Sequence, residues 1–367
     1  MKIGILTFHC AYNYGAVIQC YCLQEFLTLL GHDVYVIDYR PDYLVTPYRV
    51  FSLQNWFSLS FSKTVHKMIT EPSLLRYRIK RKNTFENFIS NTLNLLSVKE
   101  CKKISLDAIL YGSDQIWNSK INHGFFDDFY FGIGLEGKKI AYAASSKSVE
   151  LSNKEKVYYE SNLKKFHSIS VRELSLANLI RPLTNKEVSV VLDPSLLVPP
   201  TILNNISSHL KYDGYILTYD IIPNKKTKVL GERLSKLYNC RMIELSSSIT
   251  YESKETGYML GISPYDFLGY IQKARFVVTT SFHGVALSIK LNKDFYAIKQ
   301  NNNSDLRLET LLNILDLESR FVDDNTDLEI TSIAYKKVDI KLEDAINASK
   351  KFIKKALNEN ISLDTYK

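Results

Sequence analysis

The stretch KIGILTFHCAYNYGAVIQCYCLQEFLTLLGHDVYVIDY, residues 2–39, decides the fold class. Residues 2–8 and 33–39 are short apolar or β-branched runs, which are typical of buried strands. Between them, residues 16–31 carry apolar side chains at helical spacing and end on a glycine, as helices often do. The stretch therefore predicts a strand, a helix and a second strand.

The same alternation continues along the chain. Strand-like runs lie at 107–112, 139–145, 167–173 and 188–194, and a helix is expected at 153–165. A doubled proline at 199 and 200 predicts a linker, because proline interrupts strands and helix interiors. Strand-like runs then return at 215–221, 240–246, 275–281 and 294–300, with helices expected at 226–238 and 263–274. Strands alternating with helices in both halves predict two Rossmann-like, doubly wound α/β domains facing a cleft.

These runs set the expected domain bounds. We expect an N-terminal domain at 1–198, a C-terminal domain at 199–340 and a C-terminal helix at 341–367. A helical insertion is expected at about 41–100, which is aromatic and basic and includes LRYRIKRKNTFENF (75–88). Its basic face could contact an anionic membrane or a lipid-linked substrate, or it could be a solvated helix face. We favour the solvated face, because no clean amphipathic stripe is present.

Composition limits the class of protein. The chain has 367 residues, 45% of them hydrophobic, and a formal net charge of +8, which favours anionic partners. It has no run of about 18 apolar residues and no leader pattern at MKIGILTF, so we expect a cytoplasmic protein. The five cysteines lack metal-type pairing and the seven histidines are scattered, so no metal site is expected.

Four strand ends carry polar groups that packing does not require. In HCAYNYGA, Gly15 permits a tight turn, while Asn13 and Tyr14 can offer hydrogen bonds into a cleft, unless this is a plain strand–helix turn. In YGSDQIWN, Asp114 is either a functional carboxylate or a helix N-cap, and Gln115 and Trp117 follow it.

The other two strand ends are SVRE and TTSFHG. Arg172 either pairs with a carboxylate, for which adjacent Glu173 is a candidate, or offers its planar fork to an anionic ligand. His283 follows a β-branched strand where a helix begins, and backbone N–H groups at a helix N-terminus favour an anion there. A phosphate or a carboxylate fits such a position.

In order and wording these segments resemble the polysaccharide pyruvyl transferase family. The resemblance runs from Lys2 to Asp323, and its matching pieces are NYGAVIQCYCLQEFL with VIDY, GSDQIWN, YAASS, SVRE, VLDPSLL, SFHGVALSIKLNKDFYAI and RLETLLNILDLESRFVD. NYGAV, GSDQIWN and SFHG in this order are the most specific of them.

The resemblance implies a B-type glycosyltransferase architecture and a pyruvyltransferase whose donor is phosphoenolpyruvate. The product would be a pyruvate ketal across two hydroxyls of one sugar, in a bacterial exopolysaccharide, capsule or cell-wall glycan. It implies no cofactor besides phosphoenolpyruvate as co-substrate, no metal and no nucleic-acid partner. The acceptor would be a sugar or a lipid-linked oligosaccharide, which leaves open peripheral contact with the inner face of the membrane.

The resemblance also suggests roles for particular residues. It implies that Arg172 and His283 belong to the donor site, together with Ser281, Phe282 and Gly284. We expect His283 to protonate the methylene carbon of the donor, and Asp114 to act as base on the acceptor hydroxyl. The acceptor side is expected at Asn13, Tyr14, Gly15, Gln115 and Trp117.

One position departs from the family. Several relatives have Arg-Leu-His where this chain has Ser281, Phe282 and His283, so a positive charge is missing beside the histidine. Arg307 and Lys299 are the candidates to replace it.

Two other functions fit the same architecture. A nucleotide-sugar-dependent glycosyltransferase would bind a nucleotide sugar, with its diphosphate at the C-domain helix N-terminus. A non-catalytic glycan-binding protein would bind the acceptor without releasing phosphate.

Overall fold

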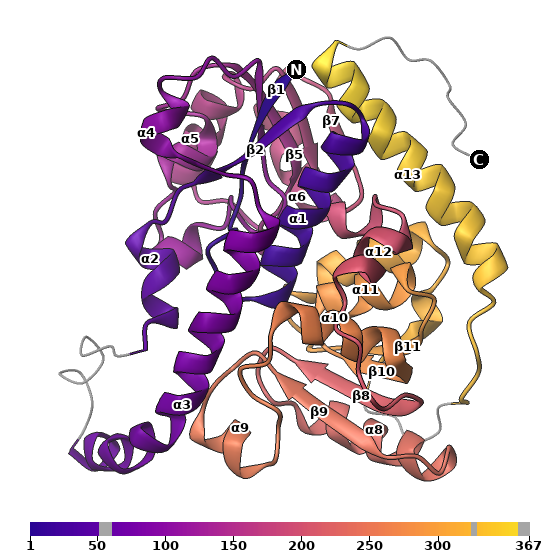
Figure 1. The fold of residues 1–367 in the computed structure, drawn as a ribbon. Coiled ribbons are helices and arrows are strands. Elements are labelled where there is room, and N and C mark those ends of the chain that lie inside the picture. Colours follow the sequence, from indigo (N-terminus) through magenta and orange to yellow (C-terminus); the bar gives the residue numbers. More distant parts are fainter. Residues whose placement is uncertain (51–60, 324–328, 359–367) are drawn as a thin grey trace.

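The computed structural model describes residues 1–50, 61–323 and 329–358, with side chains described everywhere in these ranges except at 61–69. The N-terminal sheet lies in the upper part of the molecule in Figure 1. It consists of seven parallel strands in the order β3-β2-β1-β4-β5-β6-β7. Their bounds are β1 (Lys2–Leu6), β2 (Asp33–Asp38), β3 (Leu95–Ser97), β4 (Ala108–Tyr111), β5 (Lys138–Ala144), β6 (Ser168–Val171) and β7 (Val188–Val190). Central β4 is buried along its whole length, which explains its continuous apolar run.

Five parallel strands form the C-terminal sheet, in the order β12-β11-β10-β8-β9. Their bounds are β8 (Tyr215–Asp220), β9 (Met242–Ser246), β10 (Ala274–Thr279), β11 (Asp294–Ile298) and β12 (Phe321–Val322). The strand order reverses between β1 and β4 in the first sheet and between β8 and β10 in the second. Ligands of doubly wound sheets bind at such switch points, beside the carboxyl ends of the strands.

Helices connect the strands of both sheets. The α-helices are α1 (Tyr14–Leu29), α2 (Asp42–Val45), α3 (Phe61–Thr92), α4 (Val98–Cys101), α5 (Asn153–Leu163), α6 (Leu174–Ile180), α7 (Pro200–Ile206), α8 (Lys225–Leu237), α9 (Tyr251–Glu255), α10 (Pro264–Lys273), α11 (Phe282–Lys290), α12 (Asp305–Ile314) and α13 (Tyr335–Leu357). The short 3₁₀ helices are η1 (Thr46–Tyr48), η2 (Ser119–Asn122), η3 (Asp128–Phe131), η4 (Arg181–Leu183), η5 (Pro194–Leu196) and η6 (Glu318–Arg320).

The structure differs from expectation at several elements. Strands β3 and β12 were not predicted, and the doubled proline starts helix α7, with Pro200 at its first position. Proline suits that position because the first N–H of a helix has no partner within the helix. Helix α13 begins at Tyr335, earlier than expected, and residues 359–367 lie outside the described part.

The insertion contributes to the core. Phe85, Phe88 and Ile89 of α3 are fully buried in the main apolar cluster, so the favoured reading of a solvated helix face is wrong for this half of the helix. Farther along α3, Leu74 and Tyr77 pack against a loop of the C-terminal domain. Gly261 of that loop has φ +63°, and a Cβ atom there would lie 2.7 Å from the carbonyl oxygen of Tyr77. Helix α3 therefore contacts both domains (Figure 1).

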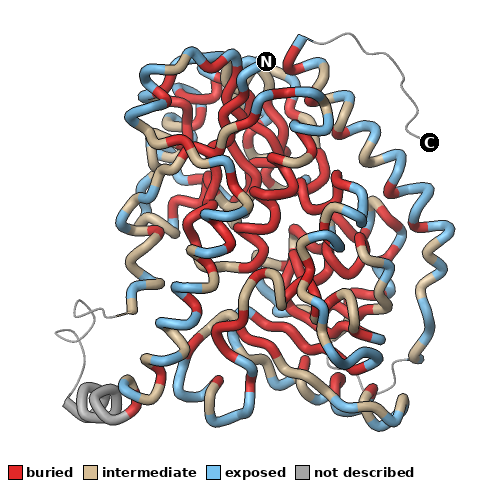
Figure 2. Tube along the Cα trace, in the orientation of Figure 1, coloured by how far each residue is buried: buried red, intermediate tan, exposed pale blue. Residues whose placement is uncertain are grey.

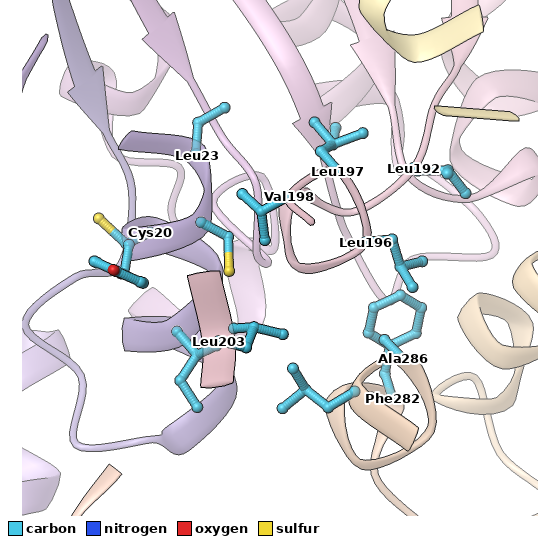
Figure 3. Packing of buried hydrophobic residues seen from close by; sticks show 14 of the residues in the cluster. Cys20, Leu23, Leu192, Leu196, Leu197, Val198, Leu203, Phe282 and Ala286 are labelled. Atoms are coloured by element: carbon cyan, nitrogen blue, oxygen red, sulfur yellow. The ribbon is translucent and has the colours of Figure 1, made fainter. Parts of the chain in front are cut away.

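One apolar cluster continues from one domain into the other. Figure 3 shows its middle, where Val198 lies between Cys20 and Leu23 of α1 on one side and Leu196 and Phe282 on the other. In Figure 2 the buried segments accordingly run without a break from the upper sheet into the helices of the lower domain. The interface between the domains is an extension of their cores.

Candidate functional site

The segment TTSFHG brings His283 to the switch point of the C-terminal sheet. Ser281 caps helix α11 by accepting a hydrogen bond from the backbone N of Gly284 at 3.3 Å. His283 Nε2 lies 3.5 Å from Asp193 Oδ2 and has no hydrogen-bond partner in the described part of the chain. The histidine side chain is 10% exposed.

Gly15 lies directly against this histidine. A Cβ atom at Gly15 would overlap the imidazole ring of His283. The predicted tight turn is wrong, because Gly15 is the second residue of helix α1 and has an ordinary helical backbone. The position requires glycine because α1 and α11 approach each other at the histidine, which leaves no room for a side chain.

Asp193, which sequence reasoning did not select, holds the site together. Its Oδ2 accepts hydrogen bonds from Arg172 Nη1 at 2.7 Å and from Ser113 Oγ at 2.9 Å. Its Oδ1 accepts from the backbone N and the Oγ of Ser195, at 2.9 and 2.7 Å. Burial alone would raise the pKa of Asp193, but His283 and Arg172 hold this pKa below its usual range. Asp193 is therefore an ionised carboxylate linking the ends of three strands to α11.

Arg172 is paired inside the protein. Besides Asp193, its Nη2 donates to Ser145 Oγ at 3.0 Å, and its guanidinium carbon lies 4.4 Å from the ring centroid of Phe282. The partner suggested by the sequence, Glu173, is more distant, with Oε2 3.9 Å from Arg172 Nε. Both Nη atoms of Arg172 are therefore used by the fold, and its main partner is Asp193.

Of the two candidates for the missing positive charge, Arg307 lies near Phe282. It comes from α12, is buried, and its guanidinium carbon lies 6.0 Å from the Phe282 ring centroid. Within the described residues it makes no hydrogen bond or ion pair, and its Nε is buried without a partner. Burial, and next the charge of Arg172, lower the pKa of Arg307 to about 10, so it stays charged at neutral pH.

Lys147 and Asp114 belong to the same cluster of charged side chains as Arg172, Asp193 and Arg307. Lys147, which was not predicted, is half-buried, and its pKa is lowered first by burial and then by Arg307. Asp114 is also half-buried, and its charge acts on Arg172, Arg307 and Lys147. Its backbone is left-handed, with φ 46°, and its Oδ1 accepts from the N–H of Gln115 at 2.8 Å. No helix begins there, so the alternative of a helix N-cap is wrong.

Three residues predicted for the site have side chains that contact other parts of the fold. Trp117 is fully buried, and its Nε1 donates to the carbonyl oxygen of Tyr130 at 3.2 Å, so it is a core residue. Tyr14 is buried, and its hydroxyl donates to the carbonyl oxygen of Ile262 at 3.3 Å. Lys299 lies over the ring of Phe321, with 5.4 Å from Nζ to the centroid.

The remaining residues predicted to bind the acceptor sugar, Asn13 and Gln115, lie near the site. Asn13 caps α1 by accepting from the N–H of Ala16 at 3.2 Å, and it lines a cavity of about 720 Å³ between the two domains. Gln115 is half-buried, and its Oε1 accepts from Asn118 Nδ2 at 2.9 Å. Among the described residues, no group of three or more histidine, cysteine, aspartate or glutamate side chains is arranged to hold a metal ion. In the same part of the chain, no helix has the length and apolarity to cross a bilayer.

The two parallel, doubly wound sheets confirm the expected architecture of two Rossmann-like α/β domains. Solved structures with a similar arrangement include a UDP-N-acetylglucosamine 2-epimerase (13% identity, 100% of this chain and 98% of that chain, TM-score 0.48) and S. aureus MnaA with UDP (12%, 98% and 91%, 0.44). Another is E. coli heptosyltransferase WaaC (10%, 87% and 100%, 0.38).

A family model described as polysaccharide pyruvyl transferase matches residues 13–302. The chain belongs to this family, and it is therefore a transferase of polysaccharide pyruvylation. A search of curated proteins found no match.

Proposed function

We propose that this chain moves the enolpyruvyl group of phosphoenolpyruvate onto two hydroxyls of one sugar as a pyruvate ketal. The observation that carries the proposal is a pair of cations, Arg307 and Lys147, without hydrogen bonds or ion pairs to the described residues. Arg307 is buried and Lys147 is half-buried, and a charge withdrawn from water without a partner is costly, so these two cations favour an anionic ligand. Phosphoenolpyruvate carries two anionic groups, a phosphate and a carboxylate.

His283 is the proton donor of the proposed reaction. A proton passes from its imidazole to the methylene carbon of the donor, and C2 becomes electrophilic. Gly15 and Asp193 hold the ring in place from two sides. This arrangement favours a fixed orientation of the imidazole, as proton transfer requires.

Asp114 is the base. As the first hydroxyl of the sugar adds to C2, Asp114 accepts the hydroxyl proton. The bond from C2 to the phosphate oxygen then breaks, and the second hydroxyl adds to C2 and closes the ring. One hydroxyl proton replaces the proton supplied by His283, and the other leaves with inorganic phosphate, so the reaction balances.

The setting of the reaction is part of the proposal. The acceptor is a sugar or a lipid-linked oligosaccharide, and the product enters a capsule, an exopolysaccharide or a cell-wall glycan. The protein acts in the cytoplasm, where a lipid-linked acceptor would bring it to the inner face of the membrane.

Donor binding tests the proposal without knowledge of the acceptor. Phosphoenolpyruvate should raise the melting temperature of the protein, because a ligand of the folded state stabilises it by mass action. Arg307→Gln removes a charge-assisted contact of about 1.5–3 kcal/mol, so we expect the dissociation constant to rise about tenfold to hundredfold. Lys299→Gln is the matched control, because Lys299 lies over Phe321 instead of in the cluster.

Either of two results would overturn the proposal. Stabilisation by a nucleotide sugar but not by phosphoenolpyruvate would indicate a glycosyltransferase. Equal loss of phosphoenolpyruvate binding in both variants would mean that Arg307 acts only through the overall charge of the protein.

A further inference from the structure

Among the described residues that line the cavity between the domains, the arginines outnumber the carboxylates by one. Its lining includes three arginines and two carboxylates. Arg49 Nη2 donates to Asp42 Oδ1 at 2.7 Å, and Arg78 Nη2 donates to Glu71 Oε1 at 3.0 Å. The arginine that remains is Arg81.

Arg81 is buried and poorly satisfied. It is 7% exposed, its Nε has no hydrogen-bond partner in the described part of the chain, and its Nη1 makes only a long contact of 3.4 Å to the carbonyl oxygen of Ser247. Its guanidinium carbon lies 5.2 Å from the ring centroid of Tyr48. A guanidinium in this state favours a phosphate or a carboxylate, whose geometry matches its planar fork.

The fold holds Arg81 in this position. Helix α3 is anchored on the C-terminal domain by Leu74 and Tyr77, and the loop at Gly261 approaches the α3 backbone near Arg81 N as well as Tyr77 O. Burial lowers the pKa of Arg81 from its ordinary value, and near neutral pH the guanidinium remains charged. The cation is therefore presented by both domains to the cavity that they enclose.

The cavity adjoins the proposed reaction centre. Asn13 lines it and lies two residues before Gly15, which contacts His283. Tyr48 also lines it, and the charge of Asp114 acts on its hydroxyl. A sugar chain in the cavity would thus end near the carboxylate proposed as base.

We propose that this cavity is the acceptor site and that Arg81 binds an anionic group carried by the acceptor. The inference rests on the proposed function, because it names the class of that reaction's second substrate. The anionic group is either the diphosphate of a lipid-linked sugar or the carboxylate of a uronic acid in the glycan.

Anion titration in the Arg307→Gln protein tests the inference, since this change weakens the proposed donor site. We would follow thermal stabilisation of the full chain by inorganic pyrophosphate and, separately, by glucuronate. We expect one of them to bind, with a dissociation constant that Arg81→Gln raises about tenfold to hundredfold. Arg81→Lys should restore part of the affinity, because it keeps the charge and loses the fork.

Arg76→Gln is the matched control. Arg76 is exposed on the same helix, and its Nη2 donates to the hydroxyl of Tyr77 at 2.6 Å. This variant should bind the anion normally. Arg81→Gln should fold, because it removes a buried charge without a carboxylate partner.

The outcomes distinguish the two possible anionic groups, and they also separate this inference from the proposed function. Binding of pyrophosphate alone identifies a diphosphate, and binding of glucuronate alone identifies a uronic acid. Binding of neither, no effect of Arg81→Gln, or an equal effect of Arg76→Gln overturns the inference. Titration of the Arg81→Gln single variant with phosphoenolpyruvate reports on the donor site alone, so failure of the proposed function would be seen there independently.

Discussion

Gly15 and His283 form a tight contact between helices of the two domains, and it can be tested directly. A methyl group at Gly15 would overlap the imidazole, so Gly15→Ala should destabilise the protein by about 1–3 kcal/mol, as overpacking does. Alanine favours a helix over glycine by about 1 kcal/mol, so helix propensity alone would give the opposite sign. Denaturant unfolding measures the change.

A double-mutant cycle provides the control. In a His283→Ala protein the ring is gone, and Gly15→Ala should then be neutral or stabilising. The same loss of stability in both backgrounds would mean that the glycine serves some purpose other than making room for the imidazole.

Asp193 shows why single residues of the site escaped sequence reasoning. Its hydrogen-bond partners Ser113 and Arg172 lie 80 and 21 residues earlier in the chain, and no local pattern reveals such pairings. The available signal was an aspartate before a proline at the end of an apolar run. The sequence also could not rank Arg307 against Lys299 as the candidate for the missing positive charge, because only the positions of their side chains distinguish them.

At the scale of elements, the end of β8 carries a titratable group with a measurable consequence. Asp220 is buried, and its Oδ1 accepts from Thr280 Oγ1 at 2.7 Å and from Thr227 Oγ1 at 3.1 Å. Burial raises the pKa of Asp220 to about 7, although these hydrogen bonds act in the opposite direction. The folded protein therefore holds this proton over a pH range in which the unfolded chain has lost it.

The sign of the pH dependence follows. The stabilising contribution of the Asp220 proton is complete below about pH 4 and is lost as the pH rises to about 7, with a slope of up to about 1.4 kcal/mol per pH unit. Asp220→Asn should remove this part of the slope, because the amide keeps an acceptor oxygen and does not titrate. Unfolding free energies of both proteins between pH 4 and 8 check this, and parallel curves would contradict it.

Sequence patterns predicted most strands of both sheets but missed the short edge strands β3 and β12. Strands such as β8 and β10 are rich in buried apolar and β-branched residues, and the structure places them within a residue or two of the expected ranges. Strands β3 and β12 have three and two residues, too few to show a period. The burial of helix α3 was predicted wrongly because its buried face packs against both α1 and the C-terminal domain. A helical pattern alone does not reveal these packing partners.

At the scale of the whole molecule, the two domains share one core. The main apolar cluster includes residues of both sheets, and helix α13 leaves the C-terminal domain and runs back along the N-terminal one (Figure 1). Phe352 of α13 packs near Tyr142 of β5, with 6.3 Å between ring centroids. We infer that the domains stabilise each other, as expected for an apolar interface.

Ser349 is the polar anchor of α13. Its Oγ accepts a hydrogen bond from the backbone N of Leu192 at 3.0 Å and donates to the carbonyl oxygen of Ala345 at 2.8 Å. Ser349→Ala leaves the buried N–H of Leu192 without a partner, which should cost about 1–3 kcal/mol of unfolding free energy.

Ser161→Ala is the matched control. The exposed Ser161 makes the same bond within its helix, to the carbonyl oxygen of Val157 at 2.8 Å, with no bond across the fold. Since Leu192 adjoins Asp193, the Ser349→Ala protein should also bind phosphoenolpyruvate more weakly than the control. Loss of stability with unchanged donor affinity would show that α13 stabilises the fold without positioning the site.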